Sequence, residues 1–381
     1  MSAPGDGDRG VARVARLADL LDELELDALL VGSLVDVRYL TGFTGSHALV
    51  LAVGEAAHAE LGPHRFFSDF RYATQSAEQV PGEFEREIVA GDLLDALGAT
   101  LTNPEERAQR GGRLGFAEAA VSVKDHRRLT ELLGQAWELV PGAGPVERLR
   151  AVKDAGEVAR IRAASELADE ALRTVLEDGL TGRGEREVAI ELELRMRRLG
   201  AQAPSFPSIV ASGAHGALPH AEPREQAIPR DVLVTIDWGA LLDGYCSDCT
   251  RTYATGEGIS TQAREIYALV LGAQETGLAA VRAGRSGREV DAIAREVIEQ
   301  AGEGEHFGHG LGHGVGMEIH EGPRLSRTAP EEPLLAGNVV TVEPGVYLPG
   351  VLGVRIEDLV VVGEDSQEVL TSLPKGLTVV S

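Results

Sequence analysis

The sequence predicts an α+β protein of two domains, an α/β domain followed by a β-rich domain that begins with helices. At 381 residues the chain is too long for one compact core. Strand-like and helical patterns alternate up to about residue 140, whereas short β-rich runs and many glycines follow residue 203. The segment PGAGP at 141–145 is a dense Pro/Gly cluster between these parts. We therefore expect domains at 1–145 and 150–381.

The first domain begins with a helical repeat. Apolar residues at 14, 17, 20, 21 and 24 have helical spacing, and the strand-like ALLVG follows them. VDVRYLTGFTG and HALVLAV are then interpreted as strands, and FFSDFRYATQSAEQ as a turn that leads into a helix. After the boundary, two amphipathic helices are predicted at about 155–178 and 184–199.

The composition excludes several classes of function. The net charge of −24 argues against nucleic acid and against an anionic membrane surface as partners, because both require basic patches. The chain has no uninterrupted apolar stretch that could span a membrane, and its first residues do not resemble a secretory signal. Two cysteines provide no disulfide framework. These features predict a cytoplasmic protein.

The segment 232–255, VLVTIDWGALLDGYCSDCTRTYAT, has the pattern of a β-hairpin whose turn contains Asp243-Gly244. With the turn centred on Leu242 and Asp243, Asp237 and Asp248 become direct cross-strand partners on one face. Two carboxylates so close repel each other and are costly to desolvate. Either one of them faces solvent or is protonated, or a cation lies between them.

A second hairpin repeats this arrangement in TVEPGVYLPGVLGVRIEDLVVV at 341–362. Glu343 and Glu357 are each seven residues from Gly350, so a tight turn there makes them partners as well. The nearby Arg355 cannot neutralise four carboxylates alone. Two such pairs in one domain therefore favour bound positive charge.

Between the hairpins lies HGLGHGVGMEIHE at 309–321, with three histidines and alternating glycines. Such a segment is a poor helix, and in an extended conformation one face has no side chains while His309, Leu311, His313 and Val315 share the other. We expect the bare backbone to admit a ligand or another element. An earlier stretch, HGALPHAEP at 215–223, adds His220 in a loop.

The chain resembles the metal-dependent peptidases of the pita-bread fold, which include aminopeptidase P, prolidase and methionine aminopeptidase. The resemblance rests on IDWG, GYCSDCTRT, HGLGHGVGMEIHE, TVEPGVY and VRIED, in the family's order, and covers 150–381. YLTGFTG at 39–45 is similar to the N-terminal domain of aminopeptidase P, prolidase and creatinase. The implied fold is a pita-bread catalytic domain after a creatinase-like α/β domain.

The resemblance implies a site in which five residues together bind two metal ions: Asp237, Asp248, His313, Glu343 and Glu357. Four carboxylates and one imidazole suit Mn²⁺ first, with Co²⁺ and Zn²⁺ as alternatives. It also implies a hydroxide that bridges the metals and attacks the scissile carbonyl, with Glu343 accepting its proton. We assign His220 and His320 to stabilisation of substrate and intermediate, and His309 to the proline pocket. An orienting role is the alternative for each histidine.

Three further residues are predicted to bind substrate. Arg355 matches a family arginine that could contact Glu343, Glu357 or substrate, and Tyr347 is either a pocket or a core residue. Asp36 in VDVRYLTGF matches a position where some aminopeptidase P sequences carry aspartate. It could meet a substrate amine across a dimer interface, or it is a solvated turn residue.

These assignments predict an Xaa-Pro aminopeptidase of the aminopeptidase P type, acting as a homodimer on peptides with proline at the second position. The alternative is an Xaa-Pro dipeptidase (prolidase), and a remote alternative is a non-catalytic binding protein of the same fold. Cys246 and Cys249 have the spacing of redox or zinc sites, but no second pair exists, so we expect buried, structural cysteines.

Overall fold

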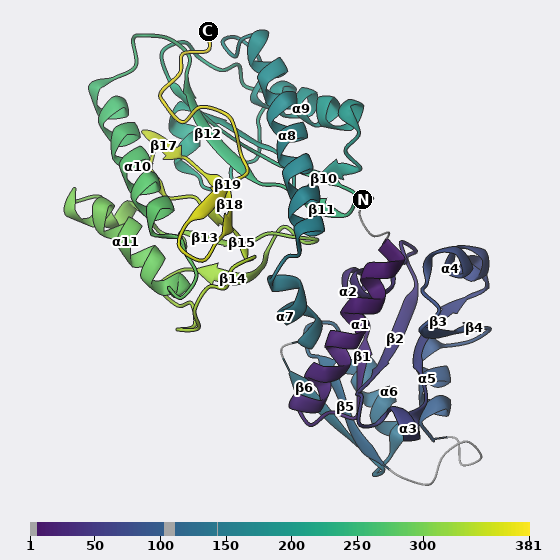
Figure 1. Cartoon of the computed structure of the whole chain (residues 1–381). Coiled ribbons are helices and arrows are strands. Elements are labelled where there is room, and N and C mark those ends of the chain that lie inside the picture. Colours follow the sequence, from purple (N-terminus) through teal and green to yellow (C-terminus); the bar gives the residue numbers. More distant parts are fainter. Residues whose placement is uncertain (1–5, 103–110, 143) are drawn as a thin grey trace. The chain divides into compact units, whose positions relative to one another are not determined.

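A computed structural model describes residues 6–102, 111–142 and 144–381. It contains two compact units, which divide between Arg150 and Ala151 (Figure 1). Residues 1–5 and Ala143, which belong to the N-terminal segment and the Pro/Gly cluster of the sequence analysis, lie outside the described residues. Among the described residues, no helix combines the length and the apolar character that a membrane span requires.

The N-terminal unit is built on a six-stranded mixed sheet with the order β4-β3-β2-β1-β5-β6. Its strands are β1 Ala28–Val31, β2 Ala48–Val53, β3 His64–Asp69, β4 Phe84–Val89, β5 Gly112–Ala117 and β6 Trp137–Gly142. Its helices are α1 Asp6–Glu23, α2 Leu34–Thr41, α3 His58–Leu61, η1 Phe70–Tyr72, α4 Ala73–Gln79, α5 Leu93–Thr102, α6 Val123–Leu133 and α7 Pro145–Ala151, the last of which reaches the boundary between the units. Apolar residues of α5 and α6 bury the sheet face that carries Leu30, Leu51 and Phe67.

One predicted strand is a helix. The segment VDVRYLT, which we expected to be a strand, forms most of α2, although its β-branched residues have strand propensity. The Ser33 side chain caps its N-terminus by accepting a hydrogen bond from the Asp36 amide, and Gly42 ends it in the left-handed conformation. The two caps, together with burial of one face, outweigh the strand propensity of this short segment.

The C-terminal unit contains four long helices: α8 Ala155–Glu177, α9 Glu185–Leu199, α10 Thr261–Ala280 and α11 Gly287–Gln300. The first two agree with the helices predicted at 155–178 and 184–199, and α8 begins with a capping box between Asp154 and Glu157. Short 3₁₀ helices are η2 Gly213–Ala217 and η3 Gly304–His306. Apolar residues of α8 and α9 share a core with β8, β9 and β12, and those of α10 and α11 share one with β15 to β18 (Figure 1).

The strands of this unit are short and antiparallel. They are β7 Ala203–Pro204, β8 Ile209–Ser212, β9 Leu233–Trp238, β10 Ala240–Leu242, β11 Tyr245–Cys246, β12 Cys249–Ala254, β13 Gly312–Gly314, β14 Glu321–Leu325, β15 Val339–Val342, β16 Gly345–Leu348, β17 Leu352–Arg355, β18 Asp358–Val362 and β19 Gln367–Val369. The sheet orders are β12-β9-β8, β11-β10-β7, β14-β13-β15-β18-β19 and β16-β17. Both predicted hairpins are present, the first from β9 to β12 and the second from β15 to β18.

Candidate functional site

The first hairpin brings Asp237 and Asp248 to one site, although not as direct partners. Asp243 and Gly244 both have positive φ and form the turn itself, so Leu242 pairs with Tyr245. In this register Asp237 lies opposite Thr250. The expected pairing with Asp248 was therefore wrong, because the turn is centred one residue later than we assumed.

The second hairpin has the expected register. Gly345 pairs with Arg355 on one side, and Val342 pairs with Asp358 on the other. Glu343 and Glu357 occupy the intervening positions and so lie opposite each other. The three-residue connection around Gly350, which has a φ of 74°, permits this symmetry.

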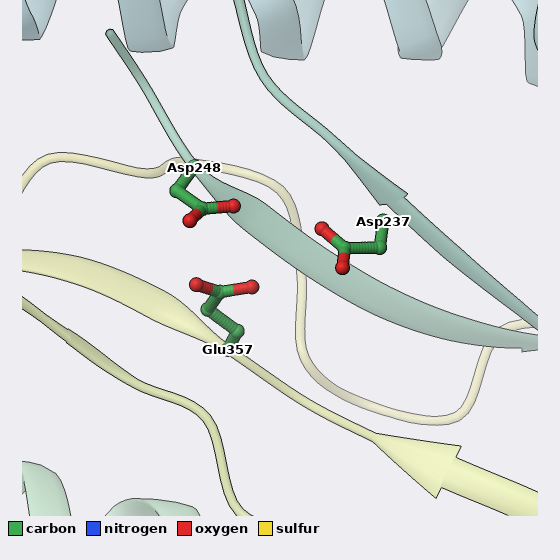
Figure 2. A group of neighbouring side chains, drawn as sticks. All are labelled: Asp237, Asp248 and Glu357. Atoms are coloured by element: carbon green, nitrogen blue, oxygen red, sulfur yellow. The ribbon is translucent and has the colours of Figure 1, made fainter. Parts of the chain in front are cut away.

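The five predicted ligand residues come together in the C-terminal unit. Asp237, Asp248 and Glu357 each present an oxygen, and these atoms lie within 4.8 Å of one another. Figure 2 shows the three carboxylates turned toward a common space. Asp237 lies on β9, Asp248 directly precedes β12, and Glu357 lies between β17 and β18. Nε2 of His313 lies 3.3 Å from Oε1 of Glu343 and 3.6 Å from Oδ2 of Asp248.

The electrostatics of this cluster favour a cation. Burial raises the pKa of Asp248 well above its ordinary value, and neighbouring carboxylates, with Glu357 first among them, raise it further. Burial likewise raises the pKa of Glu357 and Glu343. Two buried oxygens, Oδ1 of Asp237 and Oε1 of Glu357, have no hydrogen-bond partner among the described residues. Hard oxygen donors with unfilled acceptor capacity fit divalent cations.

Arg355 is the buried cation beside the cluster, and its contacts differ from the expected ones. It donates to Asp237 Oδ2 at 2.6 Å, to Tyr347 Oη at 2.8 Å, to Thr250 Oγ1 at 3.1 Å and to the carbonyl of Pro219 at 3.2 Å. Arg355 therefore pairs with Asp237 rather than with Glu343 or Glu357, and a contact with substrate stays a prediction. One guanidinium cannot balance four carboxylates.

The glycines around His313 serve the packing of strands. Only Gly312–Gly314 is extended, as β13, so the long single-faced segment that we expected is not formed. Leu311 and Val315 are buried in two different cores. A Cβ on Gly312 would lie 2.0 Å from the Thr341 carbonyl oxygen, and one on Gly314 would lie 2.2 Å from a backbone oxygen on β14. Neighbouring backbone, rather than a ligand, approaches the bare face.

The tautomer of His313 follows from its hydrogen bonds. Its Nδ1 lies 3.0 Å from the carbonyl of Gly314 and can only donate to it, which leaves Nε2 free to face the carboxylates. Its amide donates to Thr341 Oγ1 at 3.0 Å, and that hydroxyl donates to Glu343 Oε1 at 3.0 Å. Thr341 was not predicted as a site residue from the sequence. The one available signal was its position on a strand, two residues before Glu343.

Comparison with known proteins identifies the family of this chain. Residues 159–364 match the family model of metallopeptidase family M24, and residues 13–152 match that of the Creatinase/Prolidase N-terminal domain. The chain belongs to metallopeptidase family M24. The predicted resemblance and fold class are thus confirmed, and this M24 protein is a metallo-exopeptidase.

Similar proteins include an Xaa-Pro dipeptidase of Pyrococcus furiosus, which is 34% identical over 96% of this chain and 99% of its own length. A solved Xaa-Pro dipeptidase from Bacillus anthracis is 38% identical, with a TM-score of 0.89 over 97% of this chain and 99% of that one. A solved X-Pro aminopeptidase from Thermotoga maritima is 36% identical, with a TM-score of 0.83 over 95% and 100% of the two chains. The M24 family implies divalent metal ions in this peptidase.

In this M24 peptidase, His309 and Tyr347 form a chain of hydrogen bonds that leads to Arg355. His309 Nδ1 donates to the Gly310 carbonyl at 2.8 Å, so its Nε2 accepts from Tyr347 Oη at 3.0 Å. Tyr347 Oη in turn accepts from Arg355. Tyr347 is 7% exposed, and these contacts support an orienting role for His309 and Tyr347.

His220 and His320 are exposed at the edge of the cluster. The rings of His320 and His313 are 4.4 Å apart. Burial lowers the pKa of His320, and the positive charges of His313, His220 and Arg324 lower it further. Arg324 was not predicted as a site residue from the sequence. Its position, a cationic residue four positions after His320 in an acidic chain, was the available signal. It is exposed, and among the described residues no hydrogen bond or ion pair engages its guanidinium.

Asp36 does not have the solvated environment that was one of its two expected alternatives. It is 3% exposed in the first turn of α2, so it is not a solvated turn residue. Its Oδ1 accepts a hydrogen bond from Arg150 Nη1 at 2.7 Å, and Arg150 is buried as well. This ion pair neutralises the carboxylate within the N-terminal unit. Its role toward a substrate amine stays a prediction.

Cys246 and Cys249 are buried, and neither forms a disulfide within the described part of the chain. The Cys249 thiol faces the Glu357 carbonyl at 3.6 Å, and burial raises its pKa well above the ordinary value. A thiol that stays protonated is a poor nucleophile and a poor metal ligand. Cys249 is therefore a packing residue of the peptidase core, and Cys246 is buried in an apolar core as well.

Proposed function

We propose that this M24 peptidase is a metal-dependent Xaa-Pro dipeptidase, which hydrolyses the bond between the first residue and a following proline. The observation that carries the proposal is the buried cluster with two unpartnered carboxylate oxygens, Asp237 Oδ1 and Glu357 Oε1. The relatives from P. furiosus and B. anthracis, which bear the name Xaa-Pro dipeptidase, support this choice of substrate.

The proposed ligands of two divalent cations are Asp237, Asp248, His313, Glu343 and Glu357. The donor set favours Mn²⁺, with Co²⁺ and Zn²⁺ as alternatives, because four carboxylates make it rich in hard oxygen. Such cations, when bound, activate water and polarise a carbonyl.

Among the protein groups, Glu343 is suited to hold and release a proton. Its carboxyl lies among the proposed ligands, with Oε1 3.3 Å from Nε2 of His313, where a positioned carboxylate can accept and donate a proton. Thr341 holds one of its oxygens, so the orientation of the carboxyl is fixed. His220 and His320, exposed at the edge of the cluster, are proposed to hydrogen-bond the substrate carbonyl as charge develops on it.

Arg324 supports a preference for dipeptides. A dipeptide carries its α-carboxylate on the proline itself, next to the scissile bond, and this anion needs a cation close to the site. The charge of Arg324 acts on both His313 and His320, and no described residue engages its guanidinium. We assign the proline carboxylate of the substrate to this arginine.

An aminopeptidase acting on longer Xaa-Pro peptides is the second candidate, supported by the X-Pro aminopeptidase of T. maritima. The prediction of an aminopeptidase from the sequence depended on Asp36, and the carboxylate of this residue pairs with Arg150. We further propose a cytoplasmic homodimer. Two buried thiols that form no disulfide within the described residues fit a reducing compartment, and the dimer rests on the family resemblance.

Hydrolysis of Ala-Pro, Ala-Pro amide and Ala-Pro-Ala with added Mn²⁺ tests the assignment. We expect Ala-Pro to be cleaved at least about tenfold faster (by kcat/KM) than the amide, because the amide lacks the charge that Arg324 binds. Arg324→Gln should abolish this difference. Arg327→Gln, which removes an exposed arginine paired with Glu299, is the matched control. Faster turnover of the tripeptide would favour the aminopeptidase, and no turnover of any substrate would refute both.

A further inference from the structure

Thr250 lies at the centre of the buried contacts that hold the carboxylate cluster. Its side chain is fully buried on β12, directly opposite Asp237 on β9. The hydroxyl lies 2.7 Å from Glu357 Oε2 and 3.1 Å from Nε of Arg355. Because Arg355 can only donate, the hydroxyl accepts from it and directs its single proton to Glu357. The direction of these hydrogen bonds is therefore fixed.

These contacts engage one oxygen of each of two acidic residues. Arg355 Nη2 donates to Asp237 Oδ2 at 2.6 Å, and Thr250 donates to Glu357 Oε2. The other oxygens, Asp237 Oδ1 and Glu357 Oε1, have no hydrogen-bond partner in the part of the chain that the structure describes. A continuous path of hydrogen bonds from Asp237 through Arg355 and Thr250 to Glu357 thus leaves one oxygen free at each end.

The main chain fixes the position of this hydroxyl. The Glu357 amide donates to the carbonyl of Thr250 at 3.0 Å, which joins β12 to the connection between β17 and β18. On the opposite face of β12, Arg251 donates to the carbonyls of both Thr250 and Glu357 and to Asp358 Oδ1. Thr250 therefore has little freedom to move with respect to Glu357.

We propose that the Thr250 hydroxyl is a positioning group that determines which oxygen of Glu357 faces the metals and couples that choice to Arg355 and Asp237. This inference rests on the proposed metal-dependent function. Without the hydroxyl, Glu357 can rotate, and Arg355 Nε loses its acceptor. Both changes weaken the ligand set although no ligand is removed.

The test compares three variants by titration of the metal-free protein with Mn²⁺ and by its urea unfolding midpoint. Thr250→Val has nearly the same shape but no hydroxyl, and Thr250→Ser keeps the hydroxyl. Thr235→Val is the matched control, since Thr235 is a buried threonine of the paired strand that bonds to Thr252 and a backbone carbonyl. We expect Thr250→Val to weaken Mn²⁺ binding about 10–100-fold, whereas the other two variants stay within about threefold of the wild type.

Two results would overturn the inference. One is wild-type Mn²⁺ affinity in Thr250→Val, and the other is a loss in Thr250→Ser equal to that in Thr250→Val, which would assign the effect to packing of the methyl group. If Thr250→Val does not fold, Thr250→Ala takes its place, because alanine removes the hydroxyl without adding volume. A wild-type protein that binds none of Mn²⁺, Co²⁺ and Zn²⁺ would instead refute the proposed function.

Discussion

His64 makes the N-terminal unit sensitive to acid. It begins β3 and is 8% exposed, with its ring against His58 and Phe84. Its Nδ1 accepts a hydrogen bond from the Val53 amide at 3.1 Å, which requires the neutral imidazole. Burial, followed by the charge of His58, lowers the pKa of His64 from 6.5 to about 4.

The sign of the effect follows from the two pKa values. Between pH 6.5 and 4 the unfolded chain binds a proton at this histidine that the folded chain does not, so stability falls as the pH falls through this window. The difference in pKa corresponds to about 3 kcal/mol once both forms are protonated, and to about 2 kcal/mol at pH 5. Above pH 6.5 the effect vanishes.

The variant His64→Asn isolates this contribution, because the asparagine oxygen can accept from the Val53 amide but does not titrate. Urea unfolding is followed by fluorescence of Trp137, in a background where Trp238, the second of the two tryptophans, is replaced by phenylalanine. Between about pH 7.5 and 5 the free energy of unfolding of the His64 protein should fall by about 2 kcal/mol more than that of the variant. Parallel pH profiles would refute the reasoning.

Three further predictions concern the site. Arg355→Met should lower the free energy of unfolding of the metal-free protein by about 3–5 kcal/mol in urea, since the Asp237 carboxylate loses its partner. Saturating Mn²⁺ should restore part of this loss in the same titration. Gly312→Ala should cost about 1–3 kcal/mol by thermal unfolding, because its Cβ would lie 2.0 Å from the Thr341 carbonyl oxygen. Glu343→Ala should abolish turnover of Ala-Pro, and a rate near that of the wild type would contradict its proton-transfer role.

The two hairpins show how far the sequence could predict the site. Both turns were recognised, and the second register was right because its connection is symmetric about Gly350. In the first hairpin an error of one residue in the turn centre moved the partner of Asp237 by two, from Thr250 to Asp248. Side chains alternate with a period of two, so the error left both aspartates on the correct face. The cluster could therefore be predicted without the correct register.

Other features depend on contacts between distant segments, which local patterns do not contain. The helix at residues 34–41 is an exception, because its caps, Ser33 and Gly42, are local signals that the strand interpretation overlooked. The alternating glycines were correctly associated with close approach, but their neighbours are the backbones of β14 and β15. The partner of Arg355 could not be chosen among four acidic residues, because the choice depends on how the two hairpins pack.

The central claim is that the buried carboxylate cluster is a centre for two divalent cations. Equilibrium dialysis of the metal-free protein against Mn²⁺, followed by elemental analysis, tests it most directly, with Asp248→Asn as the paired variant of nearly equal shape. We predict about two tightly bound ions per wild-type chain and the loss of at least one in the variant. A wild-type chain that binds no Mn²⁺, Co²⁺ or Zn²⁺, or a variant that binds as much as the wild type, would contradict the claim.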